Sequence, residues 1–323
     1  MVHAIRVHEA GGPEVLHWEE VEVGDPGPGQ VRLRQQAVGL NYIDVYHRTG
    51  LYPQQLPFTP GTEGAGTVEA VGENVTGLMP GDRVAYAGPT GGYAEERLID
   101  AERLVKLPDE IPFQQAAAMM LQGMTVRMLL RGVHAVQTGE TILVHAAAGG
   151  VGLIMCQWAR AIGATVIGTV STDEKAEMAR THGCDHPIIY TRQDFVAEVE
   201  RITGGAKLPV VYDSVGKDTF LRSLDCLHPR GLMVSYGNAS GSPDPIPPNL
   251  LAQKGSLFLT RPTLFHYIAK REELEQSAKE LFDMVLSGKV KIEIGQTFPL
   301  KDAAEAHRAL EARKTTGSTV FTV

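Results

Sequence analysis

The fold is decided by the stretch Thr141-Ile-Leu-Val-His-Ala-Ala-Ala-Gly-Gly-Val-Gly152. An apolar run typical of a strand leads directly into a turn of small residues, and a helix-like segment, Leu153–Ile162, follows. Small residues let the backbone turn tightly and approach a pyrophosphate, whose charge then lies at a helix N-terminus. In the pattern G-x-G-x-x-G the glycine positions are Ala147, Gly149 and Gly152, so alanine replaces the first glycine. The stretch predicts a dinucleotide site, although glycine clusters also mark ordinary turns.

The length and composition indicate a two-domain globular protein. The chain has 323 residues, of which 43% are hydrophobic and 21% charged, as in ordinary globular domains. Its formal charge of −8 weighs against a nucleic-acid surface. The apolar run Ile142–Cys156 contains His145 and is shorter than the roughly 20 residues that a spanning helix needs. We therefore expect no transmembrane segment.

The N-terminus and the cysteines predict a cytoplasmic protein. The residues after Met1 lack a basic start followed by a long apolar stretch, so no signal peptide is expected. The three cysteines, Cys156, Cys184 and Cys226, are an odd number with no close spacing. That pattern suits a reducing compartment and gives no disulfide framework.

Residues 1–120 are predicted to be rich in β-strands. Three short runs alternate apolar and polar residues and are separated by pairs of proline and glycine: Gln30–Val38, Gly66–Val71 and Arg83–Ala87. This pattern is typical of a compact barrel-like or sandwich-like domain. We expect the tail that follows a helix at Glu272–Ser287 to return to this domain.

From about Met124 onward, strands and helices are predicted to alternate, which implies parallel βαβ units. The expected strands are Thr141–His145, Thr165–Val170, Pro187–Tyr190, Pro209–Ser214, Leu232–Tyr236 and Ser256–Thr260. The expected helices are Gly152–Ile162, Asp173–His182, Asp194–Thr203 and Thr219–Cys226. We therefore predict an α/β, doubly wound parallel sheet at residues 124–261, inserted into a catalytic domain formed by residues 1–123 and 262–323.

The end of the second predicted strand favours NADP over NAD. Folds that prefer NAD usually place an acidic residue there, about 20 residues after the glycine turn, to bind the ribose hydroxyls. Here the strand ends in Ser171 and Thr172, with Lys175 one turn along the next helix. Hydroxyls and an ammonium suit the anionic 2′-phosphate of NADP. The alternative is that the hydroxyls only cap the helix and Lys175 is solvated, and the nearby Asp173 complicates the count.

Several motifs, in the same order, resemble those of the NADPH:quinone oxidoreductases, the zeta-crystallin-like branch of the medium-chain dehydrogenase/reductase superfamily. Besides the glycine turn these are Asn41-Tyr-Ile-Asp44, Gly61-Thr-Glu-Gly64, Val211-Tyr-Asp-Ser-Val-Gly216 and Arg230-Gly-Leu-Met-Val-Ser-Tyr-Gly-Asn238. The similarity extends from Gly11-Gly-Pro-Glu-Val-Leu16 to Leu300-Lys-Asp-Ala-Ala-Glu-Ala-His307, and so covers nearly the whole chain. It implies a GroES-like catalytic domain.

The residues at the superfamily's zinc positions predict that no metal is bound. The alcohol dehydrogenases of the superfamily bind catalytic zinc through a cysteine in the early motif and a histidine in Gly-His-Glu, where this chain has Asn41 and Thr62. Neither an amide nor a hydroxyl is a donor comparable to thiolate or imidazole. The structural zinc lobe needs four cysteines, and residues 1–155 contain none. Without a Lewis acid, reversible alcohol oxidation is disfavoured.

The predicted cofactor residues lie at strand ends. The pyrophosphate turn comprises Gly149, Gly150, Val151 and Gly152, and the 2′-phosphate group comprises Ser171, Thr172 and Lys175. The resemblance implies that Tyr190 lies near the phosphate, that Tyr236, Gly237 and Asn238 meet the nicotinamide half, and that Arg261 and Arg313 lie near the cofactor. Ser214, Val215 and Gly216 occupy an equivalent strand end.

The predicted active-site group in the first domain is Asn41, Asp44, Tyr46 and Tyr52. The resemblance places early-motif residues against the nicotinamide, and tyrosines can line a pocket for a flat ring. Tyr46 and Tyr52 have an alternative packing role, and Asp44 an alternative role as a structural hydrogen-bond acceptor. His145 is expected to pack or to orient the backbone.

The leading hypothesis is an oxidoreductase that transfers a hydride from NADP(H) to a quinone without zinc. The cofactor carries the demanding chemistry while the protein positions it. One alternative is an NADPH-dependent reductase of enone or alkenal double bonds, and another is a non-catalytic protein that binds NADPH or RNA. A homodimer is expected, since Lys254–Thr260 could pair with its symmetry mate as an edge strand.

Overall fold

The computed structural model describes all residues, Met1–Val323, and divides into two compact units. Unit 1 comprises Met1–Met124, Ile268–Leu286 and Ile292–Val323, and unit 2 comprises Thr125–Tyr267 and Ser287–Lys291. Unit 2 is thus largely one continuous stretch inserted into the chain of unit 1. In this division the chain enters unit 2 after Met124 and leaves it after Tyr267. The domain limits expected from the sequence, after residues 123 and 261, remain predictions.

Unit 2 contains a six-stranded sheet whose neighbouring strands are all parallel. Its strands are β8 (Thr141–Val144), β9 (Thr165–Val170), β10 (His186–Ile189), β11 (Leu208–Asp213), β12 (Leu227–Ser235) and β13 (Phe258–Thr260). They lie in the order β10-β9-β8-β11-β12-β13. This is the strand order of the dinucleotide-binding fold, with the direction of winding reversing between β8 and β11. The predicted doubly wound sheet is confirmed.

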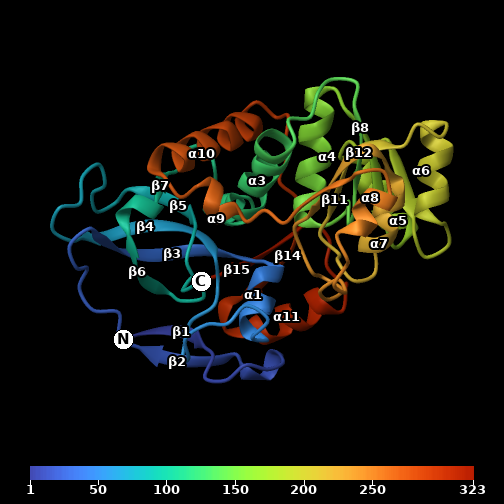
Figure 1. The fold of residues 1–323 in the computed structure, drawn as a ribbon. Helices are drawn as coiled ribbons and strands as arrows, with labels where there is room; N and C mark the ends of the chain where they lie inside the picture. Colours follow the sequence, from blue (N-terminus) through green and yellow to red (C-terminus); the bar gives the residue numbers. More distant parts are fainter. The chain divides into compact units, whose positions relative to one another are not determined.

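The helices of unit 2 follow the predicted alternation and pack around this sheet (Figure 1). They are α4 (Gly150–Ile162), α5 (Asp173–Thr181), α6 (Phe195–Thr203), α7 (Phe220–Ser223), α8 (Asn249–Gln253) and α9 (Leu264–Tyr267). Gly163 ends α4 at φ +94°, a left-handed conformation that glycine adopts without strain. The Asp194 side chain caps α6 by accepting from the N–H groups of Val196 and Ala197.

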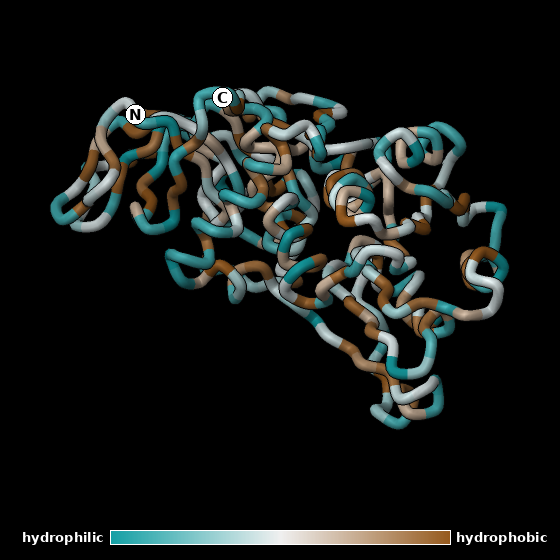
Figure 2. The backbone as a smooth tube through the Cα atoms, turned by 90° about the horizontal axis from the view of Figure 1, so that it is seen from above, coloured by the Kyte–Doolittle hydropathy of each residue, from teal (hydrophilic) through white to brown (hydrophobic).

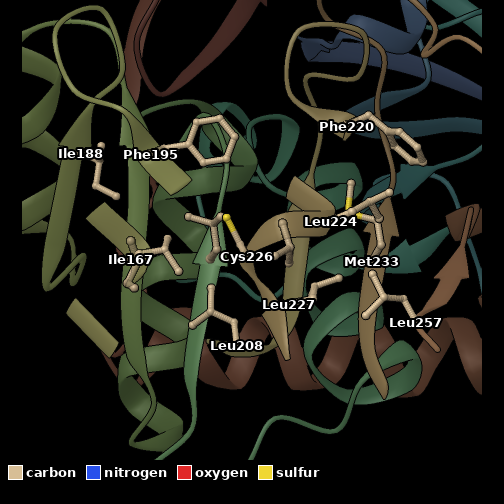
Figure 3. Close-up of a cluster of buried hydrophobic side chains, with 13 residues drawn as sticks. Ile167, Ile188, Phe195, Leu208, Phe220, Leu224, Cys226, Leu227, Met233 and Leu257 are labelled. Carbon is tan, nitrogen blue, oxygen red and sulfur yellow. The ribbon is translucent and has the colours of Figure 1, made fainter. Parts of the chain in front are cut away.

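A cluster of buried apolar side chains joins the strands of unit 2 to α6 and α7 (Figure 3). Leu208 and Met233 come from neighbouring parallel strands, and Phe195 and Phe220 come from the helices. Cys226 is buried in the same cluster, and Cys156 is buried in α4.

Unit 1 contains a seven-stranded sheet and a separate hairpin-like pair, β1 (Val2–Arg6) with β2 (His17–Val21). The larger sheet has β14 (Ile294–Pro299), β15 (Ser318–Thr322), β3 (Gln30–Leu40), β4 (Glu63–Val71), β5 (Arg83–Ala87) and β7 (Val105–Lys106) in that order, with β6 (Glu96–Asp100) also paired to β3. The C-terminal β15 pairs with the N-terminal β3, so the red end of the chain in Figure 1 joins the blue end. The predicted return of the tail to the first domain agrees with this pairing.

The helices of unit 1 include two that lie wholly within residues 1–120, where only strands were predicted. They are α1 (Tyr42–Arg48), α2 (Phe113–Ala117), α3 (Met120–Arg127, which continues into unit 2), α10 (Arg271–Leu286) and α11 (Ala303–Glu311). The unpredicted α1 follows β3 directly and carries most of the predicted active-site group. The sequence signal for it is Asn41 followed three residues later by Asp44, since such pairs cap helix N-termini.

Hydrophobic segments are short and alternate with hydrophilic ones along the chain (Figure 2). None of the helices has both the length and the apolar character needed to cross a membrane.

The core of unit 2 yields a stability prediction. Leu208→Ala removes a fully buried side chain from the cluster around Met233 and should lower the free energy of unfolding by about 2–5 kcal/mol. Leu221→Ala truncates a leucine that is 49% exposed and serves as the matched control, with an expected change within about 0.5 kcal/mol. Urea unfolding of the three proteins measures both values, and equal losses in the two variants would contradict the packing assigned to Leu208.

Candidate active site

The glycine turn lies at the carboxyl end of β8, where Gly149 is the N-cap residue of α4. A Cβ at Gly152 would lie 2.3 Å from the Ala146 carbonyl oxygen, so glycine is required there by the close approach of the backbone. A Cβ at Gly149 would meet only that same oxygen, at 3.3 Å. No side chain therefore fills the space beside Gly149, and α4 begins there with its N-terminal N–H groups, as a pyrophosphate site requires.

The end of β9 carries the residues predicted for the 2′-phosphate. Thr172 is the N-cap of α5, and its hydroxyl accepts from the backbone N–H of Lys175 at 3.3 Å. The Thr191 hydroxyl donates to the Ser171 carbonyl at 3.0 Å and ties the end of β10 to the end of β9. Tyr190 is 41% exposed beside them. The capping role considered for Thr172 is thus observed, and Ser171 and Lys175 are half-buried on either side of it.

The remaining predicted cofactor residues of unit 2 gather at the ends of β11 and β12. The Asp213 carboxylate accepts from the N–H groups of Val215 and Gly216, at 2.8 and 3.0 Å, and so shapes the turn after β11. Gly237 approaches this turn closely, because a Cβ there would lie 2.5 Å from the Ser214 carbonyl. Arg261 donates to the Gly237 carbonyl at 3.1 Å. Tyr236 and Asn238 flank Gly237 in the same segment.

Carboxyl ends of parallel strands meet at one edge of a sheet, so the ends of β8, β9, β11 and β12 form one edge of unit 2. Arg313 is not part of this group. It lies in unit 1, exposed, just after α11 at φ +58°. Its predicted role near the cofactor stays a prediction.

His145 has the structural role that was expected of it. It is buried directly before the glycine turn, with Nδ1 2.9 Å from the Thr169 hydroxyl and Nε2 2.8 Å from the Ser223 hydroxyl. Burial lowers its pKa, which keeps the ring neutral. These contacts join β8 to β9 and α7 and so fix the strand that leads into the turn.

In unit 1, Asn41 is held by a buried network at the N-terminus of α1. Its amide Nδ2 donates to Glu63 Oε1 at 2.6 Å, and its Oδ1 accepts from Gln122 Nε2 at 3.1 Å. Gln122 in turn accepts from the Ser318 hydroxyl at 2.8 Å. The other carboxylate oxygen of Glu63 accepts from the backbone N–H of Leu121 at 2.7 Å. Both ends of the Asn41 amide are therefore satisfied inside the protein.

Asp44 is fully buried and accepts several hydrogen bonds. They come from the Asn41 N–H (2.9 Å), the Tyr93 hydroxyl (3.1 Å) and the Thr62 hydroxyl (3.3 Å). Burial raises the pKa of Asp44 to about 7, although these bonds act in the opposite direction. Burial also raises the pKa of Glu63 to about 8, to which the charge of Asp44 contributes. The structural role considered for Asp44 is observed, since it caps the helix that carries the site.

A second series of buried hydrogen bonds, which starts at Arg48, orients Asp44. Arg48 pairs with Glu311 through two hydrogen bonds, at 2.8 and 3.0 Å, and lies 3.1 Å from His307 Nδ1. Because a guanidinium only donates, Nδ1 must accept, which leaves the proton on Nε2 facing the Tyr93 hydroxyl at 3.2 Å. Burial, together with the Arg48 charge, lowers the pKa of His307 to about 3. This series of hydrogen bonds therefore directs donors toward Asp44. It does not relay protons, because Arg48 cannot release a proton.

The two predicted tyrosines form one aromatic pair. Tyr46 is buried on α1 and Tyr52 is half-buried in the following loop, with their rings 5.2 Å apart in an edge-to-face arrangement. The Tyr52 N–H donates to the Tyr46 carbonyl at 3.0 Å. The packing role considered for Tyr46 is thus observed, while Tyr52 presents part of its ring at the surface of unit 1.

The donor set at the superfamily's zinc positions does not fit zinc. The amide of Asn41 is engaged at both ends, and the Thr62 hydroxyl donates to Asp44. No group of three or more histidine, cysteine, aspartate or glutamate side chains in the structure is placed to hold a metal ion. Zinc prefers thiolate and imidazole ligands, so these residues provide no comparable site.

Sequence reasoning missed Glu63, Tyr93 and His307 as members of this network. Glu63 and His307 stand within motifs already quoted above, yet nothing in one sequence shows that two buried carboxylates and a distant histidine meet. The useful signal was an acidic residue in an otherwise apolar and small-residue strand, Glu63-Gly-Ala-Gly-Thr-Val68, because a buried carboxylate needs partners.

Comparison with known proteins reveals full-length relatives. The Alcohol dehydrogenase GroES-like domain matches residues 27–109, and the Zinc-binding dehydrogenase domain matches residues 150–283. A quinone oxidoreductase of Pseudomonas aeruginosa is 54% identical over 99% of both chains. A 2-haloacrylate reductase of Burkholderia is 50% identical, also over 99% of both chains. The crystal structure of Escherichia coli quinone oxidoreductase complexed with NADPH is 48% identical and superposes with a TM-score of 0.98, covering 99% of this chain and 100% of that one.

The chain belongs to the quinone oxidoreductase family. The predicted family, the GroES-like and dinucleotide-binding fold and the oxidoreductase class are confirmed. The roles of the individual site residues in this family member stay predictions.

The raised pKa values of Asp44 and Glu63 predict a pH dependence of stability. The unfolded chain releases these protons near the ordinary values of 3.8 and 4.5, and the folded chain near 7 and 8. Between those limits the folded state holds more protons on these two carboxyl groups, which makes stability fall as the pH rises. Below about pH 6.5 the buried His47, His145 and His307, whose pKa values burial lowers, act in the opposite direction. The fall in stability is therefore expected between about pH 6.5 and about pH 8. Urea unfolding at a series of pH values measures this fall.

The matched variants for this prediction are Glu63→Gln and, as a control, Glu22→Gln at an exposed position. Glu63→Gln removes one titrating group and should flatten the decline, while the control should follow the wild-type curve. Parallel curves for wild type and Glu63→Gln would show that Glu63 does not hold a raised pKa in the folded state.

Proposed function

We propose that this chain transfers a hydride from NADPH to a quinone without a metal. NADPH, when bound, supplies a hydride, which carries two electrons and one proton, and the quinone takes up a further proton from water or a tyrosine hydroxyl to give the hydroquinone. The observation that carries the proposal is that the chain has both a glycine turn with Gly149 and Gly152 in place and an Asn41–Glu63 network at the positions where the superfamily's zinc ligands would stand.

The residues of unit 2 support cofactor binding at the carboxyl edge of its sheet. The space beside Gly149 and the N-terminus of α4 suit the pyrophosphate. Ser171, Thr172 and Lys175 suit a 2′-phosphate, and Tyr190 has an exposed ring beside them. The segment Tyr236–Asn238 and the turn Ser214–Gly216 suit the nicotinamide half, as in the family pattern. NADPH is named in the related Escherichia coli structure.

The residues of unit 1 support binding of a flat acceptor. Tyr52 presents a partly exposed ring braced by Tyr46. An aromatic face with a hydroxyl tip suits a quinone ring and its oxygens. Asn41 is fixed by Glu63 and Gln122, so its position does not depend on a bound metal.

A second candidate function is the reduction of an activated carbon–carbon double bond. It is favoured by the 2-haloacrylate reductase that is 50% identical to this chain. Both reactions deliver a hydride to an electron-poor carbon or oxygen conjugated with a carbonyl group. Neither needs a metal in principle, so the two differ in the shape of the acceptor.

We also propose that the chain forms a homodimer through β13 and that it is cytoplasmic. β13 is an edge strand of the sheet of unit 2, and Phe258 and Leu259 on it are 61% and 40% exposed. Apolar edge strands of this kind favour pairing with a second copy. The three free, buried cysteines suit a reducing compartment.

The function is tested by following the loss of reduced nicotinamide absorbance with a panel of acceptors. A large ortho-quinone, a small para-benzoquinone, an alkenal and a 2-haloacrylate are each offered with NADPH and with NADH. NADPH-selective turnover of a quinone is the expected result. Turnover of only the alkenal or the haloacrylate would transfer the assignment to double-bond reduction, and no turnover of any acceptor would contradict both.

The glycine turn is tested by Gly149→Ala, with Gly152→Ala as its counterpart. The new methyl group at residue 149 would meet only the Ala146 carbonyl oxygen, at a tight 3.3 Å, so the melting temperature should fall much less than in Gly152→Ala. It should nevertheless weaken NADPH binding by about tenfold, or about 1.4 kcal/mol, because it enters the proposed pyrophosphate space. Gly152→Ala should lower both quantities, since its Cβ would clash with the Ala146 carbonyl.

Fluorescence titration of NADPH and thermal unfolding provide the two readouts for these variants. Unchanged NADPH affinity in Gly149→Ala would place the pyrophosphate elsewhere.

A further inference from the structure

We propose that Arg192 determines the preference for NADPH over NADH by neutralising the Asp173 carboxylate at the end of β9. Arg192 thus acts on cofactor choice through another residue. The inference rests on the proposed function, since it takes the adenosine ribose to lie at this strand end.

The two side chains form a bidentate ion pair. Arg192 Nη1 donates to Asp173 Oδ2 at 2.8 Å, and Nη2 donates to Oδ1 at 2.5 Å. Paired parallel hydrogen bonds of this kind fix the orientation of both groups. The bonds from Arg192 lower the pKa of Asp173. Both carboxylate oxygens of Asp173 are therefore bonded to the guanidinium, which balances the negative charge of the carboxylate.

Arg192 reaches Asp173 from the neighbouring strand. β10 pairs in parallel with β9, with Ile189 opposite Val170, so the two strands end side by side. The Arg192 N–H donates to the Ile189 carbonyl at 3.0 Å, and the Thr191 hydroxyl donates to the Ser171 carbonyl. The turn after β10 is thus held against the turn after β9, and the guanidinium stands at the first residue of α5.

The local charge explains why this pair matters for cofactor choice. The strand end carries two acidic residues, Asp173 and Glu174, and two basic residues, Lys175 and Arg192. Without Arg192 the set is net negative, and a free carboxylate at this strand end is the feature that selects NAD. Asp173 without its partner would repel a 2′-phosphate and accept from ribose hydroxyls. With Arg192 in place, the same strand end accepts the phosphate.

The experiment measures dissociation constants for NADPH and NADH by equilibrium fluorescence titration of the full chain. Four proteins are compared: wild type, Arg192→Gln, Asp173→Asn and the double variant. Arg192→Gln should lower the NADPH preference about fivefold, because it leaves the Asp173 carboxylate as one uncompensated exposed charge, whose repulsion over about 4 Å in water has this size. In the Asp173→Asn background the same change should alter the preference by less than about twofold, because the carboxylate is already gone.

Arg201→Gln is the matched control. Arg201 forms an exposed ion pair with Glu198 on α6, at 2.6 Å, away from the strand end. It should leave the NADPH preference at the wild-type value. Both ion pairs are exposed, so thermal unfolding should show folded proteins throughout.

Three outcomes would overturn the inference in different ways. An unchanged preference in Arg192→Gln, with NADPH-selective binding by the wild type, removes the role of Arg192 and leaves the proposed function intact. An equal loss in the presence and absence of Asp173 would show that Arg192 meets the phosphate directly and does not act through Asp173. A wild type without any preference for NADPH contradicts the NADPH assignment itself and the inference with it.

Discussion

The hydrogen bond from the Asn41 amide to Glu63 is the contact on which the arrangement of unit 1 depends. A fully buried carboxylate is costly unless donors satisfy it, and Glu63 obtains them from Asn41 and from the backbone of Leu121 at the start of α3. The same amide accepts from Gln122, which is bonded to Ser318 of the C-terminal strand. Three segments far apart in the sequence, β4, α3 and β15, are thereby held around the N-cap residue of α1.

This network replaces a metal site with hydrogen bonds among protein groups. Asp44, oriented by Tyr93 and Thr62, caps α1 and keeps its N-terminus in place. In unit 2 the proposed cofactor residues come together by different means, since the parallel strand order alone brings the turns that carry them to one edge of the sheet. Hydride chemistry requires a positioned cofactor and a shaped acceptor site. The residues proposed for both are held in place here by packing and hydrogen bonds.

The sequence predicted unit 2 better than unit 1, for a physical reason. Strands such as Thr165–Val170 are buried on both faces and bounded by glycines and helix caps, so local patterns reveal them. The helix α1 is short and polar around Asn41, and its N-terminus is stabilised by Asp44 within a network that local patterns do not show. Likewise Arg192 is an ordinary arginine in the sequence, and only the pairing of β9 with β10 shows that it meets Asp173.

We propose that hydride transfer in this protein proceeds without zinc, on a site organised by Asn41, Glu63 and Asp44. The most direct measurement is the zinc content per chain and the rate of NADPH-dependent quinone reduction, determined in the same preparation before and after exhaustive treatment with a chelator. The account predicts an unchanged rate with zinc far below one ion per chain. A rate that falls in proportion to zinc removed, and returns when zinc is restored, would contradict it.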